Sequence, residues 1–379
     1  MKSFNLASNY SSRMVRALSQ AARTFFIIAV AMLGLEGQAL LAQYNGPSFL
    51  PNPVITVSTI PTNGDVNPYG VAFVPPSVTP PPQALFAPGD VLVSNFNNNE
   101  NLQGMGTTIV RVTPSGQTSL FFQGDFNHRG LSTALAVLRE GLVVAGSAPT
   151  FDGTCATVQA GSLLIISPYG QMLQAITGED IAFPWDMTVY NPGNGKFSAF
   201  VSNAISGNVV RFDMAIQGGQ VQIINKAVIG SFQHRCDPAT LVVAPTGLVY
   251  DANKDVLYVS STGDNSVFAI SNALARSSDA GTGTLVYSDQ AHLHGALAMM
   301  MAPDGHLLVS NSDGLNQDPN QPSEIVEFTT NGQFVKQLSM DPNLGGSFGL
   351  NIYPGQFNNK FAAVDDDQNT LRIWTLPTN

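Results

Sequence analysis

Six similar segments, each built of short apolar stretches separated by turns, predict an all-β fold, a six-bladed β-propeller whose last blade is closed by an N-terminal strand. Three observations carry this prediction: the composition, a repeat of about 50 residues, and a final segment that is one strand short. The elements that build the ring are predicted to lie within residues 54–377, after a targeting segment (1–42) and a short lead (43–53).

The composition favours short strands over long helices. The 379 residues include 35 Gly and 24 Pro, which punctuate the chain, and 44% are hydrophobic, which supplies a large core. Only 11% are charged, against roughly 25% in a typical soluble protein. The polar surface must therefore come mainly from amide, hydroxyl and glycine residues rather than from ion pairs.

Each repeat begins with a strand that carries one central apolar residue. These residues are Val71, Leu135, Met187, Leu248, Leu297 and Leu350, at intervals of 64, 52, 61, 49 and 53 residues. A second apolar strand follows in every repeat and ends in a small or acidic pair, at 91–95, 142–147, 199–203, 257–261, 307–311 and 361–366. Third strands follow at 108–112, 162–167, 208–213, 266–270, 324–328 and 370–374. Four short strands per repeat at this period are typical of propeller blades.

The last repeat stops after three strands, at TLRIWTLPTN. The apolar segment 54–60 (VITVSTI) precedes the first repeat and belongs to no blade of its own. It is predicted to complete blade 6, which closes the ring and removes free sheet edges. Two sandwiches in tandem would need a linker in mid-chain, and the sequence has none. The proline-rich segment 74–90 falls inside blade 1 and is expected to be a surface loop.

Residues 1–42 are predicted to be a signal peptide. Four basic residues precede or flank the apolar run 25–35, and small residues follow it as far as Ala42. The alternative is an uncleaved anchor, although the run is short for a membrane span. We therefore expect an exported protein in the periplasm, cell envelope or medium, with no membrane span in the mature chain.

The expected mature chain is acidic. Removal of 1–42 takes away four basic residues and one acidic residue, which leaves 12 and 25 and a formal charge of −13. Such a charge repels nucleic acid phosphates, so no nucleic-acid partner is expected. The predicted partner is a small molecule or a protein, bound by a monomer. No His-Glu-x-x-His motif and no phosphate-binding glycine loop is present.

Blade 4 (PTGLVYDANKDVLYVSSTGDNSVFAI, 245–270) and blade 6 (362–374) resemble NHL-repeat propellers. The resemblance covers essentially residues 54–377 and implies the propeller fold. It extends at fold level to calcium-dependent lactonases of the senescence-marker and paraoxonase type and to a copper- and zinc-linked amidating lyase, while other relatives only bind partners. The acidic residue that those lactonases place on the first inner strand is missing here, where Asn67, Pro68 and Tyr69 stand.

Histidines recur in the segments that lead into the blades, as in DFNHRG (125–130) and SFQHRC (231–236). In a propeller, these segments lie on the same face as the loops between second and third strands. Two of those loops are long, 95–108 and 312–323. The candidates for a zinc site on that face are His128, His234, His292 and His294. The alternative is that these histidines form hydrogen bonds with loop carbonyls, while the neighbouring Arg129 and Arg235 pair with carboxylates. Arg129 and Arg235 are also candidate ligand-binding residues. His306 is expected to be a solvated surface residue.

Amide and carboxylate side chains gather where strands end. Asn95, Asn203 and Asn311 end second strands, blade 6 offers Asp365 and Asp366, and Asp186 lies on the first strand of blade 3. Oxygen ligands around an axis suit Ca²⁺. The alternative is that they satisfy backbone groups at strand ends.

Cys155 and Cys236 are the only cysteines and lie on the same predicted face. In an exported protein they are expected to form a disulfide, and the alternative is two buried thiols. Taken together, the sequence predicts a ligand- or protein-binding propeller that works through its long-loop face. The alternatives are a metal-dependent enzyme, lactonase-like or a lyase, and a structural protein of the cell envelope.

Overall fold

The computed structural model describes residues 48–311, 324–343, 345–353 and 359–376. The predicted signal peptide and the predicted loop 312–323 lie outside these ranges. Among the described residues, no helix is long and apolar enough to cross a membrane.

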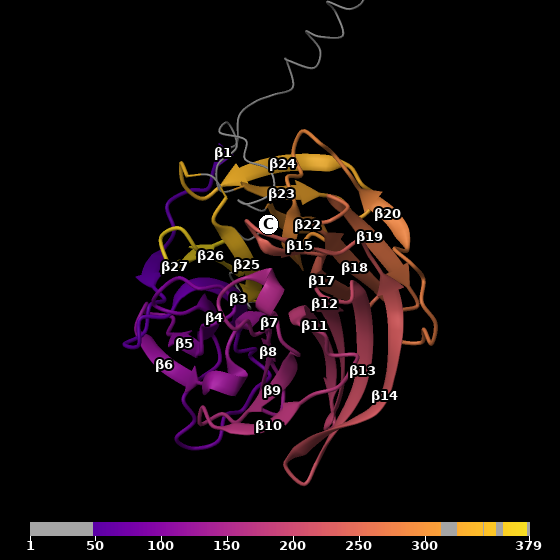
Figure 1. Cartoon of the computed structure of the whole chain (residues 1–379). Coiled ribbons are helices and arrows are strands. Elements are labelled where there is room, and N and C mark those ends of the chain that lie inside the picture. Colours follow the sequence, from indigo (N-terminus) through magenta and orange to yellow (C-terminus); the bar gives the residue numbers. More distant parts are fainter. Residues whose placement is uncertain (1–47, 312–323, 344, 354–358, 377–379) are drawn as a thin grey trace, which may run out of the picture. The chain divides into compact units, whose positions relative to one another are not determined.

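Six four-stranded antiparallel sheets form the blades of a propeller, as predicted (Figure 1). Blade 1 is β3 (Val66–Phe73), β4 (Val91–Asn97), β5 (Thr108–Val112) and β6 (Thr118–Gln123). Blade 2 is β7 (Leu131–Val137), β8 (Val143–Ser147), β9 (Ser162–Ile166) and β10 (Met172–Ile176). Blade 3 is β11 (Pro184–Gly193), β12 (Lys196–Asn203), β13 (Asn208–Gln217) and β14 (Gln220–Ser231).

Blade 4 is β17 (Pro245–Asp251), β18 (Val256–Ser261), β19 (Ser266–Ser271) and β20 (Thr284–Tyr287). Blade 5 is β21 (Ala296–Met301), β22 (Leu307–Asn311), β23 (Glu324–Phe328) and β24 (Phe334–Ser339). Blade 6 is β25 (Ser347–Tyr353), β26 (Lys360–Asp365), β27 (Thr370–Thr375) and β2 (Ile55–Ser58). Two 3-10 turns, η1 (Phe126–His128) and η2 (Cys155–Thr157), lie in blade 2 loops.

The N-terminal strand closes the ring, which confirms the prediction. β2 pairs antiparallel with β27, with Ile55 opposite Ile373 and Ser58 opposite Thr370. The innermost strands contact one another in sequence order, and β25 contacts β3 to complete the circle. Ile55 and Val57 are half-buried and pack against the apolar cluster that joins blades 6 and 1. The first and last segments of the described chain therefore lock each other in one sheet.

Two elements were not predicted. β1 (Ser48–Phe49), in the expected lead, runs parallel to β24 as a fifth strand of the blade 5 sheet. A two-stranded hairpin, β15 (Arg235–Asp237) and β16 (Leu241–Val243), precedes blade 4. The residue of blade 5 equivalent to Val71 is also Met299 rather than Leu297, because Met299 pairs with Val309 as Val71 pairs with Val93.

Serine hydroxyls join neighbouring blades near the axis. Each innermost strand has a register shift at its start, and in blade 1 the freed N–H of Gly70 donates to Ser94 Oγ at 2.9 Å. Ser94 Oγ in turn donates to the Ser132 carbonyl of blade 2 at 2.7 Å. Equivalent hydroxyls at the ends of second strands bridge blades 3 to 4, 4 to 5 and 5 to 6 (Ser202, Ser260 and Ser310). In blades 1, 3 and 5 the serine before the strand-end Asn therefore links the blade to the next one, and Ser260 does the same in blade 4.

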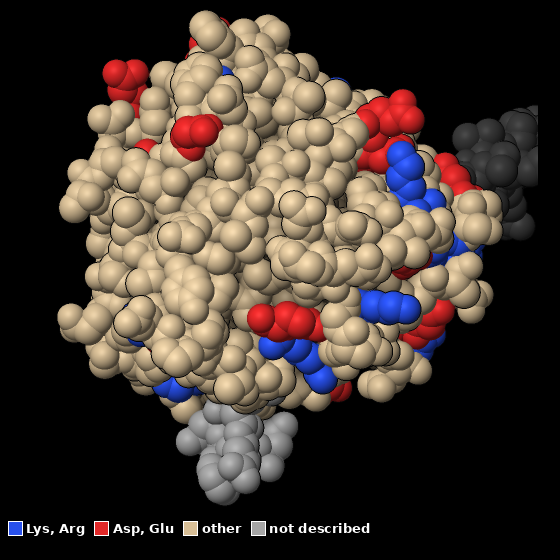
Figure 2. Space-filling view, turned by 90° about the horizontal axis from the view of Figure 1, so that it is seen from below, with Lys and Arg blue, Asp and Glu red and all other residues tan. Residues whose placement is uncertain are grey.

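The interior is apolar and the surface has few charges. Apolar side chains fill the spaces between adjacent sheets, as in the cluster that unites blades 2 and 3. Figure 2 shows that charged side chains are sparse on the surface seen there, with red and blue groups side by side on its right and red groups alone at its upper left. The low charged fraction thus matches a surface on which most residues are uncharged.

Candidate functional site

A cavity of about 490 Å³ opens at the start of the innermost strands, on the face of the predicted long loops. We call it the loop-face cavity. Its walls come from the start of β3, the β4–β5 loop, the β15–β16 hairpin and the β26–β27 turn. The lining residues are Val66, Asn67, Tyr69, Asn97, Asn99, Asn101, Gln103, Trp185, Ala239, Thr240, Val242, Thr262, Leu297, Phe348, Asp366, Asp367 and Asn369.

Aromatic rings form the floor of the loop-face cavity. The Tyr69 ring stacks on Phe348 with centroids 4.2 Å apart and on Phe96 at 4.7 Å. Trp185 meets Tyr69 edge-on at 5.8 Å. Tyr69, Trp185 and Phe348 occupy the same level on three innermost strands, from blades 1, 3 and 6. The stack therefore closes this end of the axis with a rigid, flat surface.

The polar wall consists of amide and carboxyl side chains. The Asn67 N–H donates to Asn369 Oδ1 at 2.6 Å, and Asn97 Nδ2 donates to Asn101 Oδ1 at 2.7 Å. The side-chain oxygens of Asn67 and Asn97 are buried and have no hydrogen-bond partner within the described structure. Since nearly all buried polar atoms are paired in native proteins, the wall has unused capacity to accept hydrogen bonds.

The loop-face cavity is acidic. Asp366 and Asp367 are its only charged residues among those described. Burial and the charge of Asp341 raise the pKa of Asp367. Behind this wall, the Arg372 guanidinium lies between Asp341, at 3.1 Å, and Asp365. Burial and the neighbouring Asp341 raise the pKa of Asp365 to about 7. Anionic ligands are disfavoured here, because no cationic side chain among the described lining residues would neutralise them.

A second cavity, of about 400 Å³, lies beyond the aromatic floor, along the later halves of the innermost strands. We call it the axial cavity. Asp186 lines it and is buried, with a carboxylate oxygen that accepts the Leu248 N–H at 3.0 Å. Burial raises the pKa of Asp186 from 3.8 to about 7.

The strand-end Asn residues lie outside both cavities. Asn203 Oδ1 accepts the Ala182 N–H at 2.9 Å, and Asn311 Oδ1 accepts the His294 N–H at 2.9 Å. Asn95 Nδ2 donates to the Thr59 carbonyl at 3.0 Å. These bonds fasten the segment that leads into each blade, as the structural alternative holds. Of the predicted oxygen ligands, Asp366 lines the loop-face cavity, Asp186 lines the axial cavity, and Asp365 is held by Arg372.

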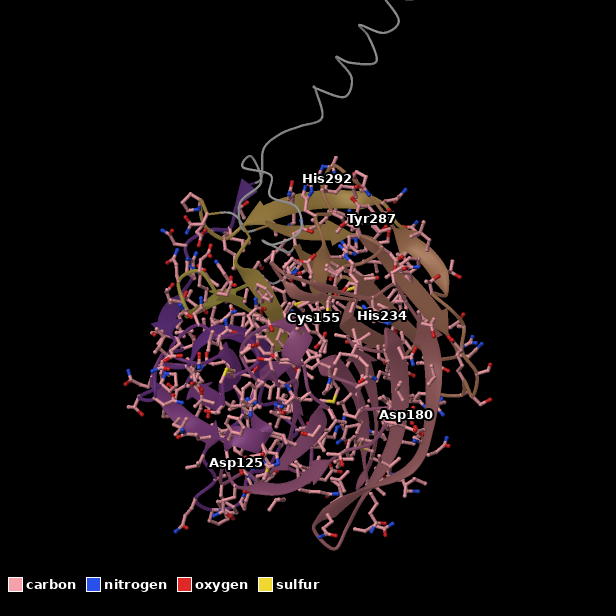
Figure 3. All side chains as sticks on the ribbon, viewed as in Figure 1. Asp125, Cys155, Asp180, His234, Tyr287 and His292 are labelled. Carbon is pink, nitrogen blue, oxygen red and sulfur yellow. A yellow bond between two sulfur atoms is a disulfide. The ribbon has the colours of Figure 1, made fainter. Side chains whose placement is uncertain are left out.

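The four candidate histidines do not form one cluster in the described structure. His128 Nδ1 is 2.7 Å from Asp125 Oδ1, and His292 Nδ1 lies close to Asp289 Oδ2, which also accepts the Tyr287 hydroxyl. Figure 3 shows Asp125 on the opposite side of the ring from His292, with His234 between them nearer the centre. His294 is buried. In the part of the chain that the structure describes, these histidines do not converge into a group of metal ligands.

The repeated His–Arg pairs differ in structure. Arg129 is buried, donates to the Thr150 carbonyl at 2.9 Å and lies over the Phe126 ring at 3.6 Å. Its hydrogen-bond acceptors are the carbonyls of Phe126 and Thr150 and the Gln159 side chain, rather than the carboxylates of the structural alternative. Arg235 is exposed, 3.9 Å from Asp237. Neither arginine lines a cavity, so the recurrence marks the segment that leads into a blade rather than a shared site.

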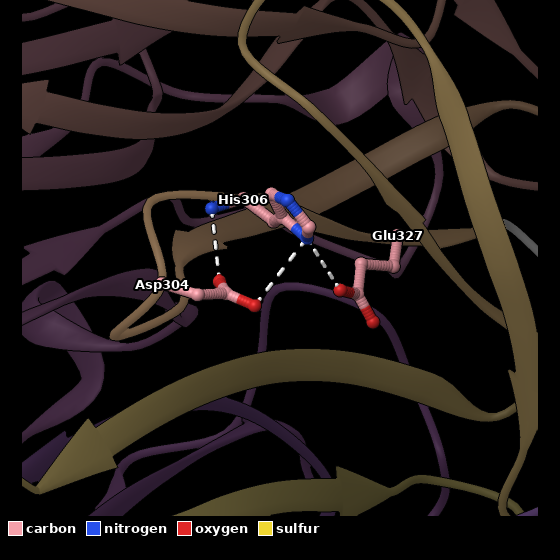
Figure 4. A group of neighbouring side chains, drawn as sticks. All are labelled: Asp304, His306 and Glu327. Carbon is pink, nitrogen blue, oxygen red and sulfur yellow. Dashed lines mark hydrogen bonds and ion pairs between the residues drawn. The ribbon is translucent and has the colours of Figure 1, made fainter. Parts of the chain in front are cut away.

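His306, expected to be solvated, belongs to an ion-pair group on blade 5 (Figure 4). Its Nδ1 lies 2.7 Å from Glu327 Oε1 and 3.4 Å from Asp304 Oδ2. These three are the only metal-ligand-type group among the described residues, and Lys336 Nζ also pairs with Glu327 at 3.2 Å. Lys336 already balances the charge of Glu327, so this group is explained as a network of paired side chains on blade 5.

Cys155 and Cys236 are joined as a disulfide, with Cα atoms 5.6 Å apart. The bond ties η2 of blade 2 to the β15–β16 hairpin. Gln103 Nε2 also donates to the Ala239 carbonyl of this hairpin at 3.5 Å. The disulfide therefore fixes one wall of the loop-face cavity.

The sequence resembles calcium-dependent lactonases at fold level, so the loop-face cavity was compared with the needs of a hard cation. Aromatic side chains occupy the innermost-strand level where ligands would have to converge. The described residues of this cavity form no group of three or more carboxylate, histidine or cysteine ligands. This donor set does not fit a cation held by converging carboxylates.

Comparison with known proteins supports the fold. No protein-family model matches the chain, and no curated protein matches it significantly in sequence. A luciferin-regenerating enzyme is 9% identical, with a TM-score of 0.50, over 86% of this chain and 96% of that protein. A proposed oxidoreductase (glucose dehydrogenase) from Thermus thermophilus is 13% identical, also at 0.50, over 84% and 99%. The calcium-binding protein regucalcin from Agrobacterium tumefaciens is 10% identical at 0.49, over 87% and 98%. The two proteins at 0.50 share the fold with this chain, whose six blades are described above, and the NHL resemblance stays a prediction.

Proposed function

We propose that the protein is a binding module that takes an uncharged polyhydroxylated ligand, such as a sugar or a short glycan, in the loop-face cavity. The observation that carries this proposal is the pairing of an aromatic floor with a wall of amide and carboxyl side chains in one cavity. Sugar rings present apolar C–H faces that pack on aromatic rings, and their hydroxyls donate hydrogen bonds to oxygen acceptors. A volume of about 490 Å³ lies within the usual range of ligand pockets, roughly 300–1,000 Å³.

The two tryptophans provide a direct assay. Trp185 lines the loop-face cavity, whereas Trp374 donates from Nε1 to the Pro51 carbonyl at 2.7 Å, near the ring closure. A Trp374→Phe variant leaves Trp185 as the sole indole. Its fluorescence should change on titration with glucose, maltose or cellobiose, and should not change with gluconate, which is anionic.

Variants of the wall test the site. Asn99 is exposed at the cavity rim, and Asn99→Ala should weaken sugar binding by up to about tenfold, the loss of one hydrogen bond. Asn253→Ala, in the exposed β17–β18 turn, is the matched control and should bind as the wild type does. A flat Trp185 signal with every sugar at high millimolar concentration would refute the proposal.

Export is the second part of this proposal, supported by the basic and apolar pattern of residues 1–42. The measurement is the intact mass and N-terminal sequence of the protein recovered from the envelope or the medium. A start near residue 43 supports cleavage, whereas a start at Met1 contradicts it.

A metal-dependent hydrolase or lyase is the alternative function, supported by the resemblance at fold level. Elemental analysis of the untagged, chelator-free protein separates the two functions. About one zinc, copper or calcium per chain would favour the enzyme. A metal-free protein that still binds sugar would favour the binding module.

A further inference from the structure

The axial cavity differs in chemistry from the loop-face cavity. Most of its lining residues are apolar, and four of them are methionines, Met187, Met299, Met300 and Met301. Methionine side chains are unbranched and polarizable, so they adapt to ligands of different shapes. The aromatic layer of Tyr69, Trp185 and Phe348 closes the other end, and no methionine lines the loop-face cavity among the residues described.

Asp186 occupies a position where the fold normally uses a small residue. The equivalent residues of the other five blades are Gly70, Ala134, Gly247, Ala298 and Gly349. A Cβ on Gly247 would lie 2.4 Å from the Leu297 carbonyl oxygen, and one on Gly349 would lie 1.9 Å from that of Tyr69. The next blade therefore excludes larger side chains at those two sites. The fold of a blade therefore does not require a carboxyl at the position of Asp186.

The Asp186 carboxylate has no charged partner in the axial cavity. It is the only ionisable residue among the described lining residues, where Thr133, Thr188, Asn351 and Asn359 supply the other polar side chains. Its hydrogen-bond partners are the backbone N–H groups of Leu248 and Met187. A buried carboxylate without a cation is costly, which is why its pKa is raised to about 7. A cation placed beside it would remove that cost.

We propose that the axial cavity is a second binding site, for an organic ammonium ion with an apolar body. The ammonium donates hydrogen bonds to the Asp186 carboxylate, and the body packs against the methionine and leucine walls. Thioether and aliphatic walls suit the apolar part, and the single carboxylate selects the charge. This site is independent of the sugar site.

The test uses three probes of the same shape: 2-phenylethylamine, 2-phenylethanol and phenylacetate. At pH 8 the amine should bind at least about tenfold more tightly than the alcohol, since a charge-assisted hydrogen bond is stronger than a neutral one. Phenylacetate should not bind. Methyl-¹³C methionine spectra locate the probe, because the four cavity methionines should shift while Met172 and Met340, outside the cavity, should not.

The pH dependence provides a check that needs no variant. With a pKa of about 7 for Asp186, lowering the pH from 8 to 5.5 should weaken amine binding by about 30-fold and leave alcohol binding unchanged. In Asp186→Asn, the preference for the amine should disappear. Equal binding of amine and alcohol at pH 8, a response confined to methionines outside the cavity, or no binding of any probe at millimolar concentration would each overturn the proposal.

Discussion

Replacement of Asp186 by Asn should stabilise the ligand-free protein at pH 8. The Asp186 carboxyl is buried at the axis, its pKa is raised to about 7 from 3.8, and burial is the main cause. An Asn amide keeps an oxygen that accepts the Leu248 N–H and carries no charge. The substitution therefore removes the cost of the buried charge and retains the hydrogen bond between blades 3 and 4.

The direction in which the free energy of unfolding changes with pH follows from proton binding to Asp186. Between pH 3.8 and 7 the folded protein holds a proton on Asp186 that the unfolded chain has lost, so the free energy of unfolding falls as the pH rises. At about 1.4 kcal/mol per pH unit, the difference between 3.8 and 7 corresponds to about 4 kcal/mol in total. About 3 kcal/mol of it should appear between pH 4.5 and pH 8.

The assay is urea unfolding of wild type and Asp186→Asn at pH 4.5, 6 and 8, followed by tryptophan fluorescence. The difference in free energy of unfolding, variant minus wild type, should grow with pH and level off above pH 7. Glu100→Gln removes an exposed carboxyl that does not line the axial cavity and serves as the control. A difference that stays constant would show that folding does not shift the pKa of Asp186, and one in which the wild type gains on the variant as the pH rises would show that the ionised carboxylate stabilises the ring; either result would refute the reasoning.

Four other changes probe the ring and its loops. Deletion of 54–60 removes β2 from blade 6 and should lower the Tm of the whole propeller, so an unchanged Tm would contradict the closure. Reduction of the Cys155–Cys236 bond should lower the free energy of unfolding by about 2–4 kcal/mol, and titration that finds two thiols in the unfolded, non-reduced chain would exclude the bond. Ser260→Ala should cost about 1–3 kcal/mol in urea unfolding, because it leaves the Gly247 N–H unpaired; a loss within error would refute the bridge between blades. Arg372→Met should cost about 3–5 kcal/mol at pH 7 and less at pH 4, because the pKa of Asp365 is raised to about 7 and its carboxyl is protonated at pH 4; a cost independent of pH would be inconsistent with this ion-pair cluster.

The repeat pattern was sufficient to predict the architecture. Apolar strands, turns and the missing last strand are local features, and the closure by Ile55–Ser58 followed from them. The position of Leu297 was assigned two residues away from its structural equivalent, Met299. A register shift at the start of each innermost strand is a pairing property that the pattern of apolar residues does not reveal.

The site was predicted less well, for a physical reason. Asn203 and Asn311 looked like ligands because they end strands, but the same position lets them bond the segment that leads into the blade. The aromatic floor was missed although its residues have a common place in the repeat. Tyr69, Trp185 and Phe348 each follow the inner-strand residue that pairs with Asn95, Asn203 or Asp365, and that alignment was the available signal.

The sequence by itself determined the class of fold, the number of blades and the closing strand, because these depend on local periodicity and on the count of strands. Only the tertiary structure decided which polar groups line a cavity and which hold the ring together. Asp366 and Asp365 are neighbours in the chain, yet one lines the loop-face cavity and the other is held by Arg372. Such assignments depend on which strands of other blades stand nearby, and that proximity is created only when the ring closes.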